Sequence, residues 1–288
     1  MGPFRCIADL RAGLLESPVW DARRRTLFVC DIPGGEIIEI DLDDGVRRRW
    51  SFDAEVTALG LGESGALVVA LARKVIVFDP ETGEQRDLWS GYDEPDTSRL
   101  NDGKVGPDGA FWVGSMDGKS VREPISRLYR VDASGSATIV ADGFAISNGL
   151  AWSPDGRIMY HSDSRGPWID RYDFDAATGA ISNRSRLRDL DEETGRPDGG
   201  ACDAEGDYWS AGVSAGVINR FAPSRELRER HAFPVPAPTM PCFCGRDLSQ
   251  LAVTTHRPGD TDSDSLSGGV FLADAPVRGA PVHRMRGI

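Results

Sequence analysis

The chain has 288 residues, 40% of them hydrophobic, with a formal net charge of -12 and a pI near 4.8. An acidic surface repels the phosphates of nucleic acid, which argues against a nucleic-acid partner. No apolar run approaches the about 20 residues that span a bilayer, and the first residues lack the regions of a secretory signal. We therefore predict a cytoplasmic protein without a membrane partner, a monomer or weak homo-oligomer whose acidity serves solubility.

The cysteines form an odd and sparse set: Cys6, Cys30, Cys202, Cys242 and Cys244. Such a set is typical of buried reduced thiols rather than of a disulfide framework. Cys242 and Cys244 could ligate zinc, but no second pair completes a four-ligand site. We expect free thiols.

One phrase recurs along the chain: a turn rich in Pro, Asp, Glu or Gly, then a short β-prone run, then small or polar residues. Its six copies are 22–31, 63–71, 107–115, 154–163, 204–212 and 247–255. The copies are spaced by roughly 40 to 50 residues, which is the length of one propeller blade. Between several of them lie second strand pairs, whose hairpin turns contain Gly83, Gly135 and Gly179.

Each repeat therefore corresponds to four strands, and six such units account for the whole chain. We predict an all-β protein, a six-bladed β-propeller with four-stranded blades that forms a single domain over residues 1–288. Residues 4–10 have no partner of their own, so we expect this N-terminal strand to close the last blade beside 268–275. Two stacked β-sandwiches would also show regularly spaced strands, but they do not repeat a turn phrase at blade length.

Side-chain oxygens recur at one position of the repeat. Counting back seven residues from the turn of the third, fourth and fifth blades reaches Asn101, Asn148 and Asp198. In the first blade, Glu16 falls at the equivalent place. The same position holds Thr57 in the second blade, and the count falls near Pro241 in the last. Four blades thus offer a carboxylate or amide oxygen, and two offer no strong ligand.

Equivalent positions in a closed ring are related by rotation about its axis, so these four side chains should converge at one end of the tunnel. Two carboxylates brought so close would repel each other and raise one pKa, a cost that a cation removes. Oxygen ligands without His or thiolate select a hard divalent ion, Ca²⁺, Mg²⁺ or Mn²⁺, with Zn²⁺ less favoured. So few protein ligands leave coordination positions open for substrate. The alternative is that these residues satisfy backbone groups in turns.

Five stretches resemble the SMP-30, regucalcin and gluconolactonase family: 14–20, 99–116, 146–156, 196–209 and 238–255. The resemblance spans the whole chain. It implies a six-bladed propeller that hydrolyses sugar lactones, with one divalent metal held by Glu16, Asn148 and Asp198. It also implies that Arg99 and Asn101 contact the substrate. Residues 256–271, which include an acidic insertion, look closest to bacterial aldonolactonases, including those for pentonolactones.

One departure from the family concerns the end of the third copy. Some relatives place a substrate-binding Glu shortly after the Met of this blade, whereas this chain has Asp117, Gly118 and Lys119 after Met116. Asp117 is the candidate for that role. The substrate choice of relatives therefore does not carry over.

The resemblance and the residues together predict hydrolysis of a pentono- or hexonolactone to its aldonic acid. Asp198 is the candidate general base and later the acid to the ring oxygen, while Arg99 would orient the ring or bind the oxyanion. Asp102, next to Asn101, should point the opposite way along the strand and be structural. Two other functions stay open: a metal-dependent phosphotriester or aryl ester hydrolase, and a non-catalytic calcium-binding propeller.

Overall fold

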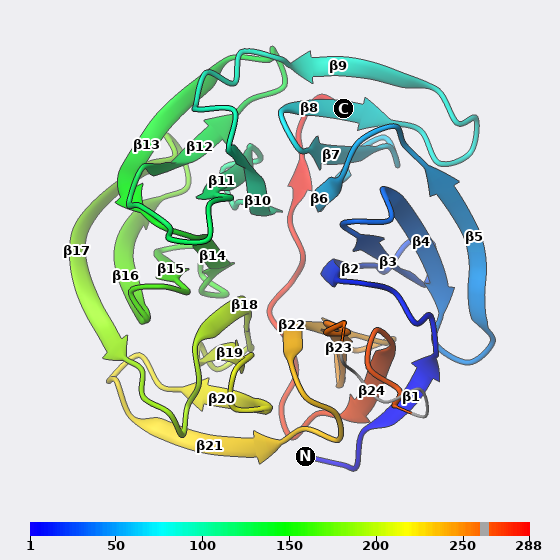
Figure 1. The fold of residues 1–288 in the computed structure, drawn as a ribbon, viewed down its shortest axis with the longest axis vertical. Coiled ribbons are helices and arrows are strands. Elements are labelled where there is room, and N and C mark those ends of the chain that lie inside the picture. Colours follow the sequence, from blue (N-terminus) through cyan, green and yellow to red (C-terminus); the bar gives the residue numbers. More distant parts are fainter. Residues whose placement is uncertain (260–264) are drawn as a thin grey trace.

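The computed structural model describes residues 1–259 and 265–288, and all regular structure in these two ranges is β-strand (Figure 1). The strands form six sheets arranged around a central axis, which confirms the predicted all-β, six-bladed propeller. Within the described ranges, no helix is long and apolar enough to cross a membrane. Part of the predicted acidic insertion, 260–264, lies outside the described residues.

The first three blades follow one another along the chain, each from its innermost to its outermost strand. The first contains β2 (Leu15–Asp21), β3 (Thr26–Asp31), β4 (Glu36–Asp41) and β5 (Gly45–Ser51). The second contains β6 (Val56–Gly62), β7 (Leu67–Leu71), β8 (Lys74–Phe78) and β9 (Gln85–Trp89). The third contains β10 (Ser98–Val105), β11 (Phe111–Asp117), β12 (Ser126–Val131) and β13 (Ala137–Phe144).

The last three blades repeat this order, and the sixth takes its outermost strand from the N-terminus. The fourth contains β14 (Ser147–Trp152), β15 (Ile158–Asp163), β16 (Trp168–Asp175) and β17 (Ala180–Asp189). The fifth contains β18 (Pro197–Cys202), β19 (Tyr208–Gly212), β20 (Val217–Phe221) and β21 (Leu227–Ala232). The sixth contains β22 (Pro238–Cys244), β23 (Gln250–Thr255), β24 (Val270–Asp274) and β1 (Arg5–Ala8).

The ring closes as predicted. β1 pairs antiparallel with β24, so that Arg5 lies opposite Leu272 and Cys6 opposite Phe271. This pairing covers the edge of the sixth blade, which would otherwise expose unpaired backbone groups. The turn glycines also behave as expected: Gly83, Gly135 and Gly179 all have positive φ, a conformation that costs glycine little.

The burial of the strands follows their position in the blade. All five residues of β7 are buried, because neighbouring blades pack against both of its faces. The outermost β21 instead alternates half-buried and exposed residues, since only one of its faces meets protein. The five cysteines are unpaired, as predicted, and four of them are buried.

Each of the six innermost strands contains a register shift near its first residues. In β2, for example, Glu16 lies opposite Cys30 while Val19 lies opposite Phe28, so the inner strand carries one extra residue. Such a β-bulge bends the strand and changes the direction of side chains. The repeated bulge therefore directs polar side chains toward the tunnel at the end where the innermost strands begin. We call this end the bulged end of the tunnel.

The C-terminal segment crosses the middle of the ring (Figure 1). Its strand β25 (Arg284–Met285) adds to the second blade by pairing parallel with β6. Ala280 N donates to Cys202 O at 3.0 Å and Arg286 N to Gly109 O at 3.0 Å, both at the turn end of innermost strands. Residues 280–283 line a cavity of about 70 Å³ in the tunnel. The segment thus covers the tunnel end opposite the bulges.

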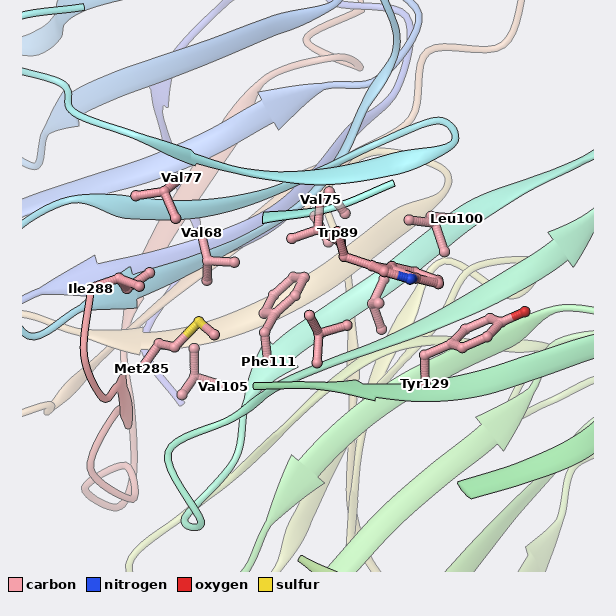
Figure 2. Close-up of a cluster of buried hydrophobic side chains, with 14 of the residues drawn as sticks. Val68, Val75, Val77, Trp89, Leu100, Val105, Phe111, Tyr129, Met285 and Ile288 are labelled. Atoms are coloured by element: carbon pink, nitrogen blue, oxygen red, sulfur yellow. The ribbon is translucent and has the colours of Figure 1, made fainter. Parts of the chain in front are cut away.

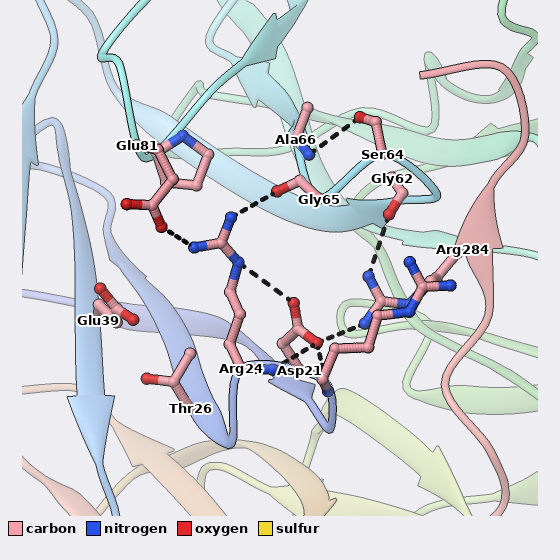
Figure 3. A network of polar contacts seen from close by, with 12 residues as sticks. Asp21, Arg24, Thr26, Glu39, Gly62, Ser64, Gly65, Ala66, Glu81 and Arg284 are labelled. Carbon is pink, nitrogen blue, oxygen red and sulfur yellow. Dashed lines mark hydrogen bonds and ion pairs between the residues drawn. The ribbon is translucent and has the colours of Figure 1, made fainter.

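Side chains anchor this segment in two ways. Met285 and Ile288 join the hydrophobic cluster between the second and third blades, with Val68, Val105 and Phe111 (Figure 2). Arg284 donates to Gly62 O at 3.1 Å and forms an ion pair with Asp21 (Figure 3). The C-terminal segment therefore ties together the turns of the first, second, third and fifth blades.

Candidate active site

A chain of hydrogen bonds connects three neighbouring blades at the bulged end of the tunnel. Arg99 Nη1 donates to Asn101 Oδ1 at 2.8 Å, and Asn101 Nδ2 donates to Asn148 Oδ1 at 2.9 Å. Asn148 Nδ2 in turn donates to Asp198 Oδ1 at 2.8 Å. The structure thus brings together four of the predicted site residues, carried by β10, β14 and β18.

Glu16 extends this group to the first blade. Burial, followed by the negative charges of Asp198 and Asp102, raises the pKa of Glu16 well above its ordinary value. A carboxylate affects another in this way only at short range. Glu16 therefore lies near Asp198, although the two lie far apart in the sequence.

Asp198 has a carboxyl group that titrates near neutrality. Burial raises its pKa to about 7, and the charge of Asp102 acts in the same direction. Arg196, the hydrogen bond from Asn148 and Arg99 oppose the shift without cancelling it. The site therefore concentrates negative charge that Arg99 and Arg196 only partly offset.

The sequence predicts that Asp102 points away from the site, but its carboxylate acts on this charged group. Its Oδ2 accepts from Leu150 N at 3.0 Å in the next blade, so the expected structural role is present. The strand is bulged between Leu100 and Gly103, however, and the strict alternation of side chains is lost there. The buried Asp102 carboxylate consequently acts on both Glu16 and Asp198.

Asn148 is held by the blade on its other side. Its Nδ2 also donates to Ser164 Oγ at 2.8 Å, and Ser164 Oγ donates to Pro197 O at 2.6 Å. The next residue, Gly149, has φ +67°, and an added Cβ would lie 2.4 Å from Tyr208 Oη. Only glycine fits this backbone. Ser164 has no signal in the repeat register, and the sequence reasoning missed it.

The oxygen atoms of this group are of the kind that binds a divalent cation. Two carboxylates with raised pKa and an amide oxygen suit a hard ion such as Ca²⁺. In this structure the nitrogen of Asn148 faces Asp198, so sharing an ion requires a half-turn of the amide about Cβ–Cγ. That rotation gives up the hydrogen bond from Asn101 and the one to Asp198. After this rotation of the Asn148 amide, the residues fit a divalent cation.

Arg99 is fixed in place beside the carboxylates. Its Nε forms an ion pair with Glu55 at 3.2 Å, and Nη1 also donates to the backbone oxygen of Leu100 at 2.8 Å. About a fifth of the side chain is exposed (19%). A guanidinium held from two sides can offer its remaining N–H groups to a ligand without a large loss of entropy.

Asp117 does not join this group. Its buried carboxylate accepts from Glu123 N at 3.0 Å, Lys119 N at 3.2 Å and Thr97 Oγ1 at 3.3 Å. The hydrogen bond from Glu123 is the main reason that its pKa is lowered. Asp117 thus orders the loop after β11, and its predicted contact with substrate has no geometric support here.

In the last blade, the residue at the repeat position differs from the one that the count along the sequence predicts. The bulge of β22 contains Thr239 rather than Pro241, and Thr239 Oγ1 donates to Leu15 O at 2.6 Å. Asn101 Nδ2 makes the same kind of bond to Ser147 O at 3.0 Å. The count of seven failed because Thr239 lies eight residues before Asp247 of the following turn, whereas Asn101 lies seven before Asp108.

A second acidic group lies at the opposite end of the fifth blade. Among the described residues, Asp203, Glu205 and Asp207 have carboxylate oxygens within 4.8 Å of one another. Arg220 pairs with all three, at 2.9, 2.7 and 2.9 Å. An arginine already supplies the positive charge, so this group is an ion-pair network rather than a cation site.

Comparisons with known proteins agree with this geometry. A family model described as the SMP-30/gluconolactonase/LRE-like region matches residues 14–257. The chain belongs to the SMP-30/gluconolactonase/LRE-like family. Within the SMP-30/gluconolactonase/LRE-like family, the 6-deoxy-6-sulfogluconolactonase of Pseudomonas putida is 34% identical over 281 residues, which cover 96% of each chain.

Two regucalcins are similar over almost the full length. Regucalcin of Oryctolagus cuniculus is 34% identical over 295 residues and covers 99% of this chain and 98% of its own. The solved structure of a regucalcin from Agrobacterium tumefaciens, described as a calcium-binding protein, superposes with a TM-score of 0.91 at 26% identity. It covers 99% of this chain and 98% of its own. The predicted family and fold are confirmed.

Proposed function

We propose that this protein hydrolyses a sugar lactone to the corresponding aldonic acid, using a divalent cation held by Glu16, Asn148 and Asp198. One observation carries the proposal. Polar side chains from three blades form one hydrogen-bonded group, and the charge of Asp198 within it acts on Glu16 from a fourth blade, with negative charge that Arg99 and Arg196 only partly offset. Such a group is suited to a cation and to an ester substrate beside it.

The relatives support the reaction class. The Pseudomonas putida relative is named as a lactonase, and the match to the gluconolactonase family spans most of this chain. Lactonases are carboxylic ester hydrolases, and a lactone is an internal ester. A pentono- or hexonolactone is the substrate class that we expect.

Asp198 is the residue that we assign to proton transfer. A cation in the site would supply Lewis acidity that polarises the lactone carbonyl. The Asp198 carboxylate can accept a proton from the attacking water and return it to the ring oxygen as the bond to it breaks.

Arg99 and Asn101 are the residues that we assign to substrate positioning. Both are held rigidly beside Asp198 by the hydrogen bonds described above. N–H groups fixed in this way can bind the ring hydroxyls or the developing oxyanion, which keeps the carbonyl carbon in place for attack.

Calcium binding without catalysis is the second candidate, because the Agrobacterium structure is described as a calcium-binding protein. A panel of sugar lactones, assayed by acid release with and without EDTA, tests both. We expect turnover that EDTA removes and that Ca²⁺, Mg²⁺, Mn²⁺ or Zn²⁺ restores. Calcium binding without turnover of any lactone would favour the second candidate, and turnover of a phosphotriester or aryl ester alone would favour a different hydrolase.

A further inference from the structure

Three arginines gather at the bulged end of the tunnel, each from a different blade. Arg196 lies two residues before Asp198, and Arg165 directly follows Ser164, whose hydroxyl contacts Asn148. Arg122 lies in the loop after β11, where its Nε donates to Asp117 O at 2.9 Å. Asp117 pairs with Ser98, the neighbour of Arg99. The loops of the third, fourth and fifth blades thus carry these arginines to the rim of the candidate site.

The positive charges of these arginines act on one another. Burial and then the charge of Arg165 lower the pKa of Arg122, and the charge of Arg196 adds to this effect. The charge of Arg122 in turn contributes to lowering the pKa of Arg99. Charges at the surface influence each other in this way only when they are close. The loops that carry Arg122, Arg165 and Arg196 therefore lie close together at the rim of the candidate site.

Carboxylates act on this group only without direct ion pairs: the charge of Asp117 acts on Arg122, and the charge of Arg196 acts on Asp198. Within residues 1–259 and 265–288, neither Arg122, Arg165 nor Arg196 forms an ion pair with a carboxylate. The nearby Asp117 carboxylate accepts hydrogen bonds from the backbone of its own loop, and Glu123 forms an ion pair with Lys119 at 3.5 Å. Asp163 accepts hydrogen bonds from backbone N–H groups.

This arrangement is unexpected in a protein with 45 acidic and 33 basic side chains. Arg165 and Arg196 are exposed and Arg122 is half-buried, so their guanidinium groups can meet a ligand from solvent. An anionic ligand between them would relieve their mutual repulsion. Arginine is also the side chain that binds the oxygens of phosphate, sulfonate and carboxylate groups in a forked geometry.

We propose that Arg122, Arg165 and Arg196 form a subsite for an oxyanion carried by the substrate, so that the preferred lactone bears a phosphate, sulfonate or carboxylate group away from its ring ester. This inference rests on the proposed function and names its substrate class. The arginines bind the charged substituent, while Asp198 and its neighbours act on the ester.

Kinetics on matched substrates test the subsite. Hexono-1,5-lactones that carry a hydroxyl, phosphate, sulfonate or carboxylate group at carbon 6 are compared in the wild type and in the double variant R165Q/R196Q. We expect at least one charged lactone to have a kcat/KM about tenfold above that of the neutral lactone. The double variant should raise KM for that lactone about tenfold more than KM for the neutral lactone, which it affects only through the charge of Arg196 on Asp198. The charged lactone with the highest kcat/KM identifies the anionic group that the subsite prefers.

Two controls make the result specific. R157Q removes an exposed arginine from a turn at the opposite end of the fourth blade and should change neither KM. R165K keeps the charge and should recover part of the affinity. A wild type that prefers the neutral lactone, or a double variant that weakens neutral and charged lactones equally, would overturn the subsite.

A binding measurement separates this inference from the proposed function. Calorimetry with gluconate and 6-phosphogluconate does not require turnover. We expect the phosphorylated acid to bind about tenfold more tightly, and the difference to vanish in R165Q/R196Q. If no lactone is hydrolysed but this difference is present, the reaction is wrong and the subsite stands. Equal binding of the two acids would overturn the subsite even if lactones are hydrolysed.

Discussion

Asp198 differs from an ordinary surface aspartate in its surroundings. Burial and the neighbouring Asp102 keep its pKa near 7, and Asn148 holds one of its oxygens at 2.8 Å. A residue in that state can both accept and donate a proton near neutral pH. The same carboxylate is also a candidate cation ligand, which makes it the most sensitive position of the site.

The variant Asp198→Asn removes this proton carrier while keeping the size of the side chain. We expect lactone turnover to fall to less than a tenth of the wild-type rate. The folded state should be no less stable, because a desolvated carboxylate is removed. Initial rates and thermal unfolding measure the two effects, with Asp87→Asn on the outer strand β9 as the control. A variant that keeps more than a tenth of the rate would remove Asp198 from the mechanism.

His161 provides a second test at the residue scale. It is fully buried, contacts Ser147 Oγ at 2.7 Å and packs against Phe144, and burial lowers its pKa to about 3. Above pH 6.5 the imidazole is neutral whether the chain is folded or unfolded. As the pH falls below 6.5, only the unfolded chain gains the proton, so the free energy of unfolding decreases.

Between pH 7.5 and pH 5 this effect amounts to about 2 kcal/mol. We expect His161→Phe to lose less stability over this interval than the wild type, by about that amount. Urea unfolding at both pH values measures it. Ser147→Ala keeps the imidazole and should retain the wild-type pH dependence. Parallel profiles for the wild type and His161→Phe would contradict the buried neutral histidine.

At the scale of elements, the bulge in each innermost strand decides where the site residues point. In the fourth blade this bulge depends on Gly149, whose φ of +67° and close neighbours exclude a side chain. An added Cβ would lie 2.5 Å from Ser162 Oγ and 3.1 Å from Asp198 O. The backbone that presents Asn148 is thus built around a glycine.

We expect Gly149→Ala to destabilise the protein by about 2 to 4 kcal/mol, from both the strained backbone and the overpacking. Turnover should fall strongly, since Asn148 is displaced with the bulge. Gly206→Ala is the matched control: its φ is also positive, at +91°, but nothing lies within 4 Å of the added Cβ. It should cost about 1 to 2 kcal/mol and leave the rate unchanged. Equal losses in the two variants would mean that crowding at Gly149 has no effect.

At the scale of the whole molecule, the two chain ends close the structure by different routes. The N-terminal strand completes the sixth blade, and the C-terminal segment crosses the far end of the tunnel to the second blade. Figure 2 shows Met285 and Ile288 among the side chains between the second and third blades. The site lies at the other end of the innermost strands, so the segment stabilises the ring without touching the reacting groups.

Met285→Ala should therefore lower the free energy of unfolding by about 2 to 5 kcal/mol, because it leaves a cavity among fully buried side chains. Lactone turnover by the folded variant should stay within twofold of wild type. Denaturant titration and initial rates measure the two quantities. Arg286→Ala changes the exposed neighbour and should cost little. A large loss of turnover in folded Met285→Ala would mean that the segment also shapes the site.

The sequence by itself determined the blade number, the closure by residues 4–10 and the recurrence of Glu16, Asn101, Asn148 and Asp198 at one repeat position. A repeat in a closed ring converts sequence register into rotation about an axis, so local patterns carry this information. Only the tertiary structure decided the group of arginines at the rim and the path of the C-terminus. The bond from Leu150 to Asp102 and the ion pair of Arg284 with Asp21 join residues distant in sequence, which no local pattern specifies.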